Sequence, residues 1–245
     1  MLTAFVLVHG GFHGAWCWSD TTRRLREHGH WVATVELPGR GDTAHLAATV
    51  TLGDWVAALD GVVDTAPERP VLVAHSIGAT TVNQYAEAHA DKVAELVYVC
   101  AVTPRDGDSG SSTMLEAGPE SVLLRDGSFT PGPDQTAVLN KECAVEAFYE
   151  SCNQSDIEYA LAHLSPEPML PLITPLTLGA AFRGIPKTYI AARDDKAMPL
   201  AFQIELAHRM EARLVLIDGD HSPFYSAPEA LLGALLNPRA TAAAH

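Results

Sequence analysis

The stretch that most constrains this chain is residues 70–81, PVLVAHSIGATT, where an apolar run meets a helical pattern at one serine. Residues 71–73 are β-branched or leucine and predict a buried strand, and the residues that follow are compatible with a helix. Ala74 and Gly78, two positions either side of Ser76, are small enough for strand and helix to meet without collision. The pattern predicts a nucleophile elbow, in which Ser76 Oγ projects above the edge of a sheet.

The composition narrows the range of partners. The 245 residues, taken as one α/β domain over 1–245, are enough to bury a substantial core. Thirty acidic and sixteen basic side chains give a formal charge of −14. We therefore expect neither nucleic acid nor an anionic membrane as a partner, because both favour a positive surface.

The cysteines and the N-terminal segment indicate the cellular compartment. The apolar run 2–8 is too short to span a bilayer and lacks the flanks of a signal peptide, so it is better interpreted as the first strand. The four cysteines show no paired CxxC spacing and are expected to be reduced thiols of a cytoplasmic protein, with a disulfide as the less favoured alternative. They are Cys17, Cys100, Cys143 and Cys152.

Strand and helix patterns alternate along the chain. Apolar segments predict six strands at 3–8, 31–35, 71–74, 93–100, 187–192 and 213–217. Helical patterns occupy about 18–28, 51–65, 77–90, 199–210 and 228–236. Continuous apolar strands that alternate with helices predict an α/β fold with a mostly parallel, doubly wound six-stranded sheet.

One connection is much longer than a helix and two loops. Between Cys100 and Lys187 we predict an inserted helical cap at about 103–186, with helices near 134–150 and 155–164. The alternative is a surface insertion without a role. Its apolar and aromatic content favours a lid that walls a substrate pocket, and the residues expected to line it are Met114, Leu115, Phe129 and Phe148.

Polar residues follow four of the predicted strands, where ligands of open parallel sheets bind. Ser76 needs a base within hydrogen-bond reach, and His221, after the last strand, is the best candidate. A carboxylate must orient that imidazole, and Asp194 or Asp195 can supply it. The order Ser, Asp, His along the chain is the one found in α/β-hydrolases.

A carbonyl oxygen that gains charge needs fixed donors. The amides of Ile77, directly after the serine, and of Gly11, in the loop after the first strand, are suitably placed to form an oxyanion hole. Gly10, Phe12 and His13 of the same loop are candidates to contact substrate, although for His13 a structural role, with a hydrogen bond to this loop, is favoured. We find neither metal-ligand spacing nor a GxGxxG motif, and we expect no metal and no cofactor.

Motifs along nearly the whole chain carry a family resemblance. FVLVHGGFHGAWCW, AHSIG, ARDDKAMPLAFQ and DGDHSPFYSAPEAL resemble the signature, elbow, acid loop and histidine loop of the plant methylesterase and hydroxynitrile lyase group of α/β-hydrolases. FYESCNQSDIEYALAHLSPEP resembles the cap of that group. The resemblance implies a cap-covered apolar pocket, no cofactor and a possible homodimer. It also favours Asp195 over Asp194, because the acid in the family's loop lies four residues before a proline, here Pro199.

Two positions bear on the reaction. Lyase members of the group carry a hydroxyl or amide side chain where this chain has Gly10, and some carry a lysine where it has Ser222. Both departures favour a serine carboxylesterase acting on a small or medium hydrophobic ester. Two alternatives remain open: a lyase or cyclase that uses His221 as a base without an acyl-enzyme, and a non-catalytic binder of small molecules.

Overall fold

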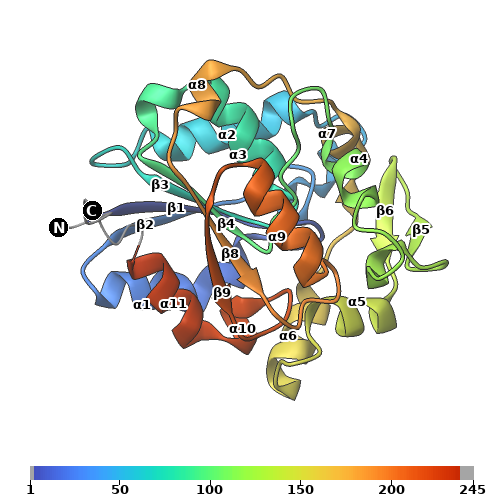
Figure 1. Ribbon diagram of the computed structural model, residues 1–245. Coiled ribbons are helices and arrows are strands. Elements are labelled where there is room, and N and C mark those ends of the chain that lie inside the picture. Colours follow the sequence, from blue (N-terminus) through green and yellow to red (C-terminus); the bar gives the residue numbers. More distant parts are fainter. Residues whose placement is uncertain (1–2, 238–245) are drawn as a thin grey trace.

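The computed structural model describes residues 3–237 and contains a six-stranded sheet of order β2-β1-β3-β4-β8-β9 (Figure 1). Every pair of neighbouring strands is parallel. The strands are β1 (Ala4–Val8), β2 (Trp31–Val35), β3 (Val71–His75), β4 (Glu95–Val99), β8 (Lys187–Ala192) and β9 (Arg213–Ile217). All six predicted strands are present, and the prediction of an α/β-hydrolase-type parallel sheet is confirmed.

Helices cover both faces of this sheet, because successive strand residues point to opposite sides. Val6 and Leu72 belong to one apolar core, whereas Leu7 and Val73 belong to the other. The first core packs under α2 (Leu52–Val63), α3 (Gly78–Ala88) and α9 (Leu200–Arg209), and the second under α1 (Ser19–Glu27) and α11 (Pro228–Leu236). No helix within residues 3–237 is long and apolar enough to cross a bilayer.

The insertion between β4 and β8 is not purely helical, which corrects the sequence expectation. It contains a three-stranded antiparallel sheet of β5 (Phe129–Pro131), β6 (Thr136–Leu139) and β7 (Glu167–Pro168). The helix expected near 134–150 begins only at Lys141. Asp134 and Gln135 have φ of 53° and 56°, left-handed values that reverse the chain in a tight turn, and β6 then pairs with both neighbours.

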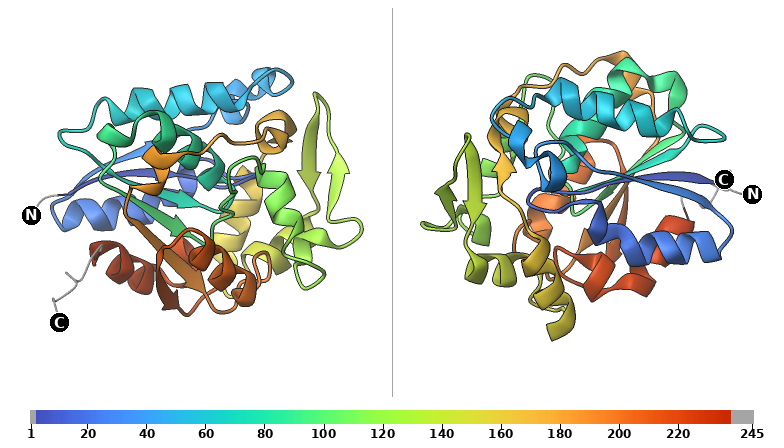
Figure 2. Two further views of the ribbon diagram at one scale, coloured as in Figure 1. Left: turned by 45° about the horizontal axis from the view of Figure 1, so that its top comes forward. Right: turned by 180° about the vertical axis from the view of Figure 1, so that it is seen from behind.

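The insertion lies over one end of the main sheet, as the three views show (Figures 1 and 2). Its own apolar cluster includes Leu123, Leu139 and Phe148, and this cluster also takes in Phe12 from the loop after β1. The insertion is thereby packed onto the carboxyl end of the sheet. Its helices are α4 (Gly110–Leu115), α5 (Lys141–Phe148), α6 (Gln154–His163), α7 (Met169–Ile173) and α8 (Ala180–Arg183).

Shorter elements complete the described chain. Four 3₁₀ turns lie at Ala15–Trp18, Gly41–Leu46, Ala90–Lys92 and Val122–Leu124, and the short helix α10 spans Pro223–Ser226. Helix α2 begins with a capping box, in which Thr51 Oγ1 accepts from the Asp54 amide and the Asp54 carboxylate accepts from the Thr51 amide. This cap explains why the helix begins directly after Thr51.

Candidate active site

Ser76 lies at the apex of the turn between β3 and α3. Its φ of 50° is left-handed, an uncommon conformation for a residue other than glycine, and it turns the chain sharply from strand to helix. A Cβ at Gly78 would lie 2.4 Å from the carbonyl oxygen of His9, so a larger residue does not fit there. Ala74 is fully buried, whereas Ser76 remains partly exposed. The turn therefore has the geometry expected of a nucleophile elbow.

A chain of hydrogen bonds joins Ser76 to two residues from other strand ends. His221 Nε2 is 3.0 Å from Ser76 Oγ, and His221 Nδ1 is 2.8 Å from Asp195 Oδ2. The other Asp195 oxygen accepts the amides of Ala197 at 2.9 Å and Met198 at 2.7 Å. Because the carboxylate accepts, the proton of the neutral imidazole lies on Nδ1 and leaves Nε2 free to accept the serine proton.

The neighbouring aspartate lies outside this chain. The side chain of Asp194 is exposed, and its backbone amide donates to the carbonyl oxygen of Gly219 at 3.0 Å. Asp195 is buried, with 5% of its surface exposed. The two adjacent side chains leave β8 in different directions, and the structure brings only Asp195 to His221.

Three buried histidines brace the backbone around Ser76. His9 Nδ1–H donates to the carbonyl oxygen of the next residue at 2.9 Å, His13 Nδ1–H to Gly11 O at 2.8 Å, and His75 Nε2–H to His221 O at 2.8 Å. Burial lowers the pKa of His13 to about 3 and those of His9 and His75 well below 6.5. All three rings are therefore neutral near pH 7.

Two backbone amides beside Ser76 are free to bind a ligand atom. Across residues 3–237, neither the Gly11 nor the Ile77 N–H has a hydrogen-bond acceptor. A Cβ at Gly11 would lie 3.3 Å from Ile77 Cγ2, so the two residues are neighbours. Unpaired donors at this place could stabilise negative charge on a carbonyl oxygen.

A cavity of about 470 Å³ opens at Ser76, between the main sheet and the insertion. Its walls are mostly apolar. Five of the residues expected to contact substrate line it: Phe12, Met114, Leu115, Phe129 and Phe148. Further apolar lining residues that the sequence did not indicate include Val102, Leu123, Ala137, Met169 and Leu172.

The chain is similar to known proteins along most of its length. It matches the alpha/beta hydrolase family over residues 5–234. The chain belongs to this family. The protein named "Putative methylesterase 11, chloroplastic" from Arabidopsis thaliana is 28% identical over 244 residues, covering 95% of this chain, which spans 63% of that relative.

Two further similarities cover most of this chain and most of the protein compared with it. Norfluorocurarine synthase 1 of Strychnos nux-vomica is 30% identical over 246 residues, 93% of this chain and 91% of the relative. The crystal structure of polyneuridine aldehyde esterase has a TM-score of 0.85 at 25% identity, covering 97% of this chain and 99% of that one. The predicted resemblance to methylesterase-like α/β-hydrolases is confirmed.

Two residues of this α/β-hydrolase that were expected to contact substrate do not line the cavity. Gly10 packs behind the serine, where a Cβ would lie 2.7 Å from His75 Nδ1 and 2.8 Å from Ser76 Cβ. His13 lies behind the loop that carries Gly11, where its Nε2 accepts from the hydroxyl of Tyr149 at 2.7 Å. Both residues shape the loop from the side away from the cavity.

Two buried charged residues near the site were not predicted from the sequence. Asp220 accepts the Ser151 amide at 2.9 Å, the Ser222 amide at 2.9 Å and the Ser226 hydroxyl at 2.8 Å, and so ties the insertion to the histidine loop. Glu167, within the proline-rich stretch of the insertion, lines the cavity itself. Both acids lie within motifs that carry the family resemblance, DGDHSPFYSAPEAL and FYESCNQSDIEYALAHLSPEP, but no local pattern assigns a role to either.

One trio of potential metal ligands occurs in the described part of this hydrolase. The ligand atoms of Cys100, Asp195 and His221 lie within 4.8 Å of one another. Sequence spacing did not reveal the trio, because each residue follows a different strand. Burial raises the pKa of the Cys100 thiol well above 9.0, so it stays protonated and is a poor metal ligand. The trio fits the hydrogen-bonded chain better than a metal site.

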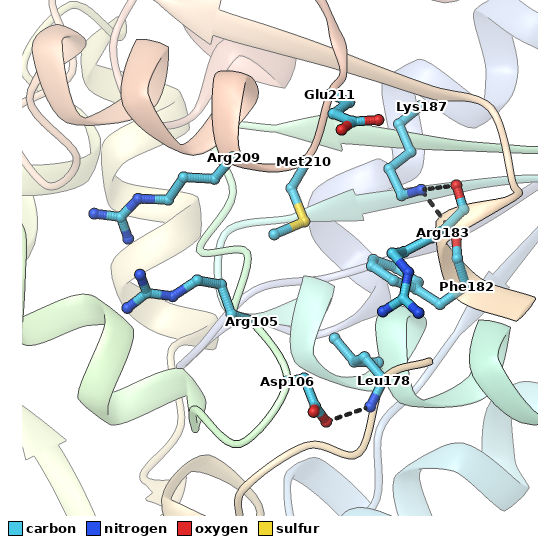
Figure 3. Close-up of a pocket in the computed structure, with 9 residues that line it drawn as sticks. All are labelled: Arg105, Asp106, Leu178, Phe182, Arg183, Lys187, Arg209, Met210 and Glu211. Atoms are coloured by element: carbon cyan, nitrogen blue, oxygen red, sulfur yellow. Dashed lines mark hydrogen bonds between the residues drawn. The ribbon is translucent and has the colours of Figure 1, made fainter. Parts of the chain in front are cut away.

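A second cavity, of about 200 Å³, shares no lining residue with the first (Figure 3). Two of its polar side chains, those of Lys187 and Asp106, are hydrogen-bonded within the protein. Lys187 Nζ donates to the carbonyl oxygens of Phe182 at 2.9 Å and Arg183 at 3.3 Å, and Asp106 accepts the Leu178 amide at 2.9 Å. The Lys187 bonds close the end of α8 onto the start of β8, and the Asp106 bond joins two segments of the insertion.

Proposed function

We propose that this protein is a serine carboxylesterase that cleaves a small or medium hydrophobic ester through an acyl-enzyme. The observation that carries the proposal is the Ser76–His221–Asp195 chain at an apolar cavity, beside the free amides of Gly11 and Ile77. Relatives named methylesterase and polyneuridine aldehyde esterase support ester hydrolysis. A cavity of about 470 Å³ has the size of ordinary small-molecule sites.

Each residue has one part in the proposed reaction. Ser76 Oγ attacks the ester carbonyl while His221 Nε2 takes its proton, and Asp195 stabilises the resulting imidazolium. The Gly11 and Ile77 amides donate to the oxygen as it becomes negative. His221 then returns the proton to the leaving alcohol. Water activated by the same imidazole releases the acid from Ser76.

The test is hydrolysis of chromogenic esters with graded acyl and alcohol sizes. Ser76→Ala should abolish turnover, because loss of the nucleophile of a triad typically costs on the order of a million-fold in kcat. A serine-directed fluorophosphonate should label the wild type but not the variant, whereas a mere binder would resist labelling. Substantial turnover by purified, folded Ser76→Ala would refute the acyl-enzyme mechanism.

A lyase or synthase on the same scaffold is the second candidate. It is favoured by the 30% identity to norfluorocurarine synthase 1 over 93% of this chain. Against cyanohydrin cleavage, the present loop has no room for a side chain at Gly10, and Ser222 replaces the lysine of some lyases. Cyanohydrin cleavage would identify a lyase of that kind, whereas ester hydrolysis that Ser76→Ala abolishes would identify the esterase.

A further inference from the structure

The loop that carries Gly11 is held from the insertion. The Phe12 amide donates to Glu167 Oε2 at 2.6 Å, and the Phe12 carbonyl oxygen accepts the Ser165 amide at 3.0 Å. Glu167 is the first residue of β7, and Ser165 lies two residues before it. Both backbone groups of the residue after Gly11 are thus bonded to one short segment of the insertion.

Phe12 adopts a conformation that needs such support. Its φ is 61°, in the left-handed region that bulky side chains disfavour. The peptide between Gly11 and Phe12 is held at both ends, since His13 Nδ1–H bonds its oxygen and Glu167 bonds its N–H. These two bonds fix the position of the Gly11 Cα, and if either were lost the Gly11 backbone could shift and move its own free N–H relative to the cavity.

Arg40 neutralises the carboxylate that makes this contact. Arg40 Nε donates to Glu167 Oε2 at 3.1 Å, and its Nη2 donates to Oε1. Both side chains are 1% exposed, and the guanidinium lies 4.7 Å from the ring centre of Trp55. Because Glu167 also lines the cavity at Ser76, an unbalanced carboxylate there would oppose an oxyanion.

We infer that Glu167 is a positioning residue for the oxyanion hole, acting through the Phe12 amide to direct the Gly11 N–H at the reacting carbonyl. The inference rests on the proposed ester hydrolysis and deepens it. A residue that only anchors the insertion would affect stability. A positioning residue affects the transition state more than substrate binding, and therefore lowers kcat with little change in KM.

The experiment compares Glu167→Ala with Glu167→Gln. Two donors, the Phe12 amide and Arg40 Nε, meet at Oε2, so the glutamine amide oxygen should occupy that position and keep the Phe12 bond. We expect Glu167→Ala to lower kcat at least ~10-fold with KM within ~3-fold, because a lost oxyanion donor costs roughly 10²–10³. Glu167→Gln should stay within about 3-fold of wild type in kcat, although both variants lower Tm.

Each kcat value is calculated per mole of Ser76 that a fluorophosphonate labels at completion. This normalisation corrects for any difference between variants in the fraction of folded protein. The double variant Arg40→Met/Glu167→Ala is measured alongside, since it leaves no buried guanidinium without a counter-charge. The matched control is Glu87→Gln. Glu87 on α3 also accepts two amides of the insertion, those of Gly179 at 2.7 Å and Phe182 at 2.9 Å, but contacts no part of the oxyanion loop. Its kcat should equal that of wild type.

The outcomes separate the inference from the proposed function. Equal kcat per labelled serine in wild type, Glu167→Ala and the double variant would reduce Glu167 to an anchor and overturn the inference. A Glu167→Gln variant as slow as Glu167→Ala would also overturn it, because the Phe12 acceptor is then not the cause. If wild type labels at Ser76 but cleaves no ester, the proposed function fails while the inference is tested by labelling rate, which uses the same oxyanion donors. A wild-type protein that is neither labelled by the fluorophosphonate nor able to hydrolyse an ester would refute both the proposed function and the inference.

Discussion

The sharpest test of the candidate site is the replacement of each of the two adjacent aspartates by asparagine. In the structure, Asp195 Oδ1 accepts two amides and Oδ2 faces His221 Nδ1. An asparagine at 195 must turn its carbonyl oxygen to the two amides, which leaves its NH₂ facing His221. The imidazole then carries its proton on Nε2 and cannot accept the proton of Ser76.

The expected loss follows from this tautomer. In serine proteases the same substitution lowers kcat roughly 10⁴-fold, equivalent to about 5.4 kcal/mol of barrier at 1.36 kcal/mol per tenfold change. Asp194→Asn is the matched control, because that side chain is exposed and makes no bond to His221. We expect it to change kcat less than about ten-fold. Steady-state kcat on one chromogenic ester decides the matter, and an Asp195→Asn variant within ten-fold of wild type would refute the reasoning.

Two further predictions concern reaction class and pH. Mandelonitrile should release no benzaldehyde above the spontaneous rate; rapid release that Ser76→Ala abolishes would favour the lyase. The second prediction is that the folded protein loses stability at acidic pH. Histidines of an unfolded chain titrate near pH 6.5, but in the folded protein burial holds the pKa of His13 at about 3 and those of His9 and His75 well below 6.5. As pH falls below 6.5 the unfolded chain takes up protons that the folded one does not, so the free energy of unfolding should fall by up to about 1.4 kcal/mol per pH unit per histidine. Urea unfolding at pH 7 and 5.5 measures this, and equal values would contradict the assignment of neutral buried rings.

Much of the main sheet and the candidate site could be predicted from local sequence. The continuous apolar runs predict strands that are covered on both faces, because alternate residues enter different cores. Small residues around Ser76 predict the elbow for a steric reason that involves only five consecutive positions. The polar residues after each strand predict which side chains can meet, because parallel strands share one carboxyl edge.

The structure of the insertion depends on contacts that local sequence does not specify. Residues 136–139 lie inside a segment with a helical pattern, yet they form β6, because pairing with β5 and β7 outweighs the local preference. Similarly, Gly10 and His13 lie within two residues of Gly11 in sequence but do not line the cavity. The direction in which a loop residue points depends on backbone angles such as the φ of 61° at Phe12, which the neighbouring structure supports.

The sequence by itself thus determined the fold class, the elbow serine and the histidine and acid that could serve it, because burial periodicity and local sterics act over a few residues. The tertiary structure alone decided the strand order, the shape of the cavity and the pairing of Arg40 with Glu167, 127 positions apart. Burial of these two charges is tolerated only because they are paired and hydrogen-bonded to each other. Nothing within either local segment specifies the partner, which is selected by the packing of the insertion on the sheet.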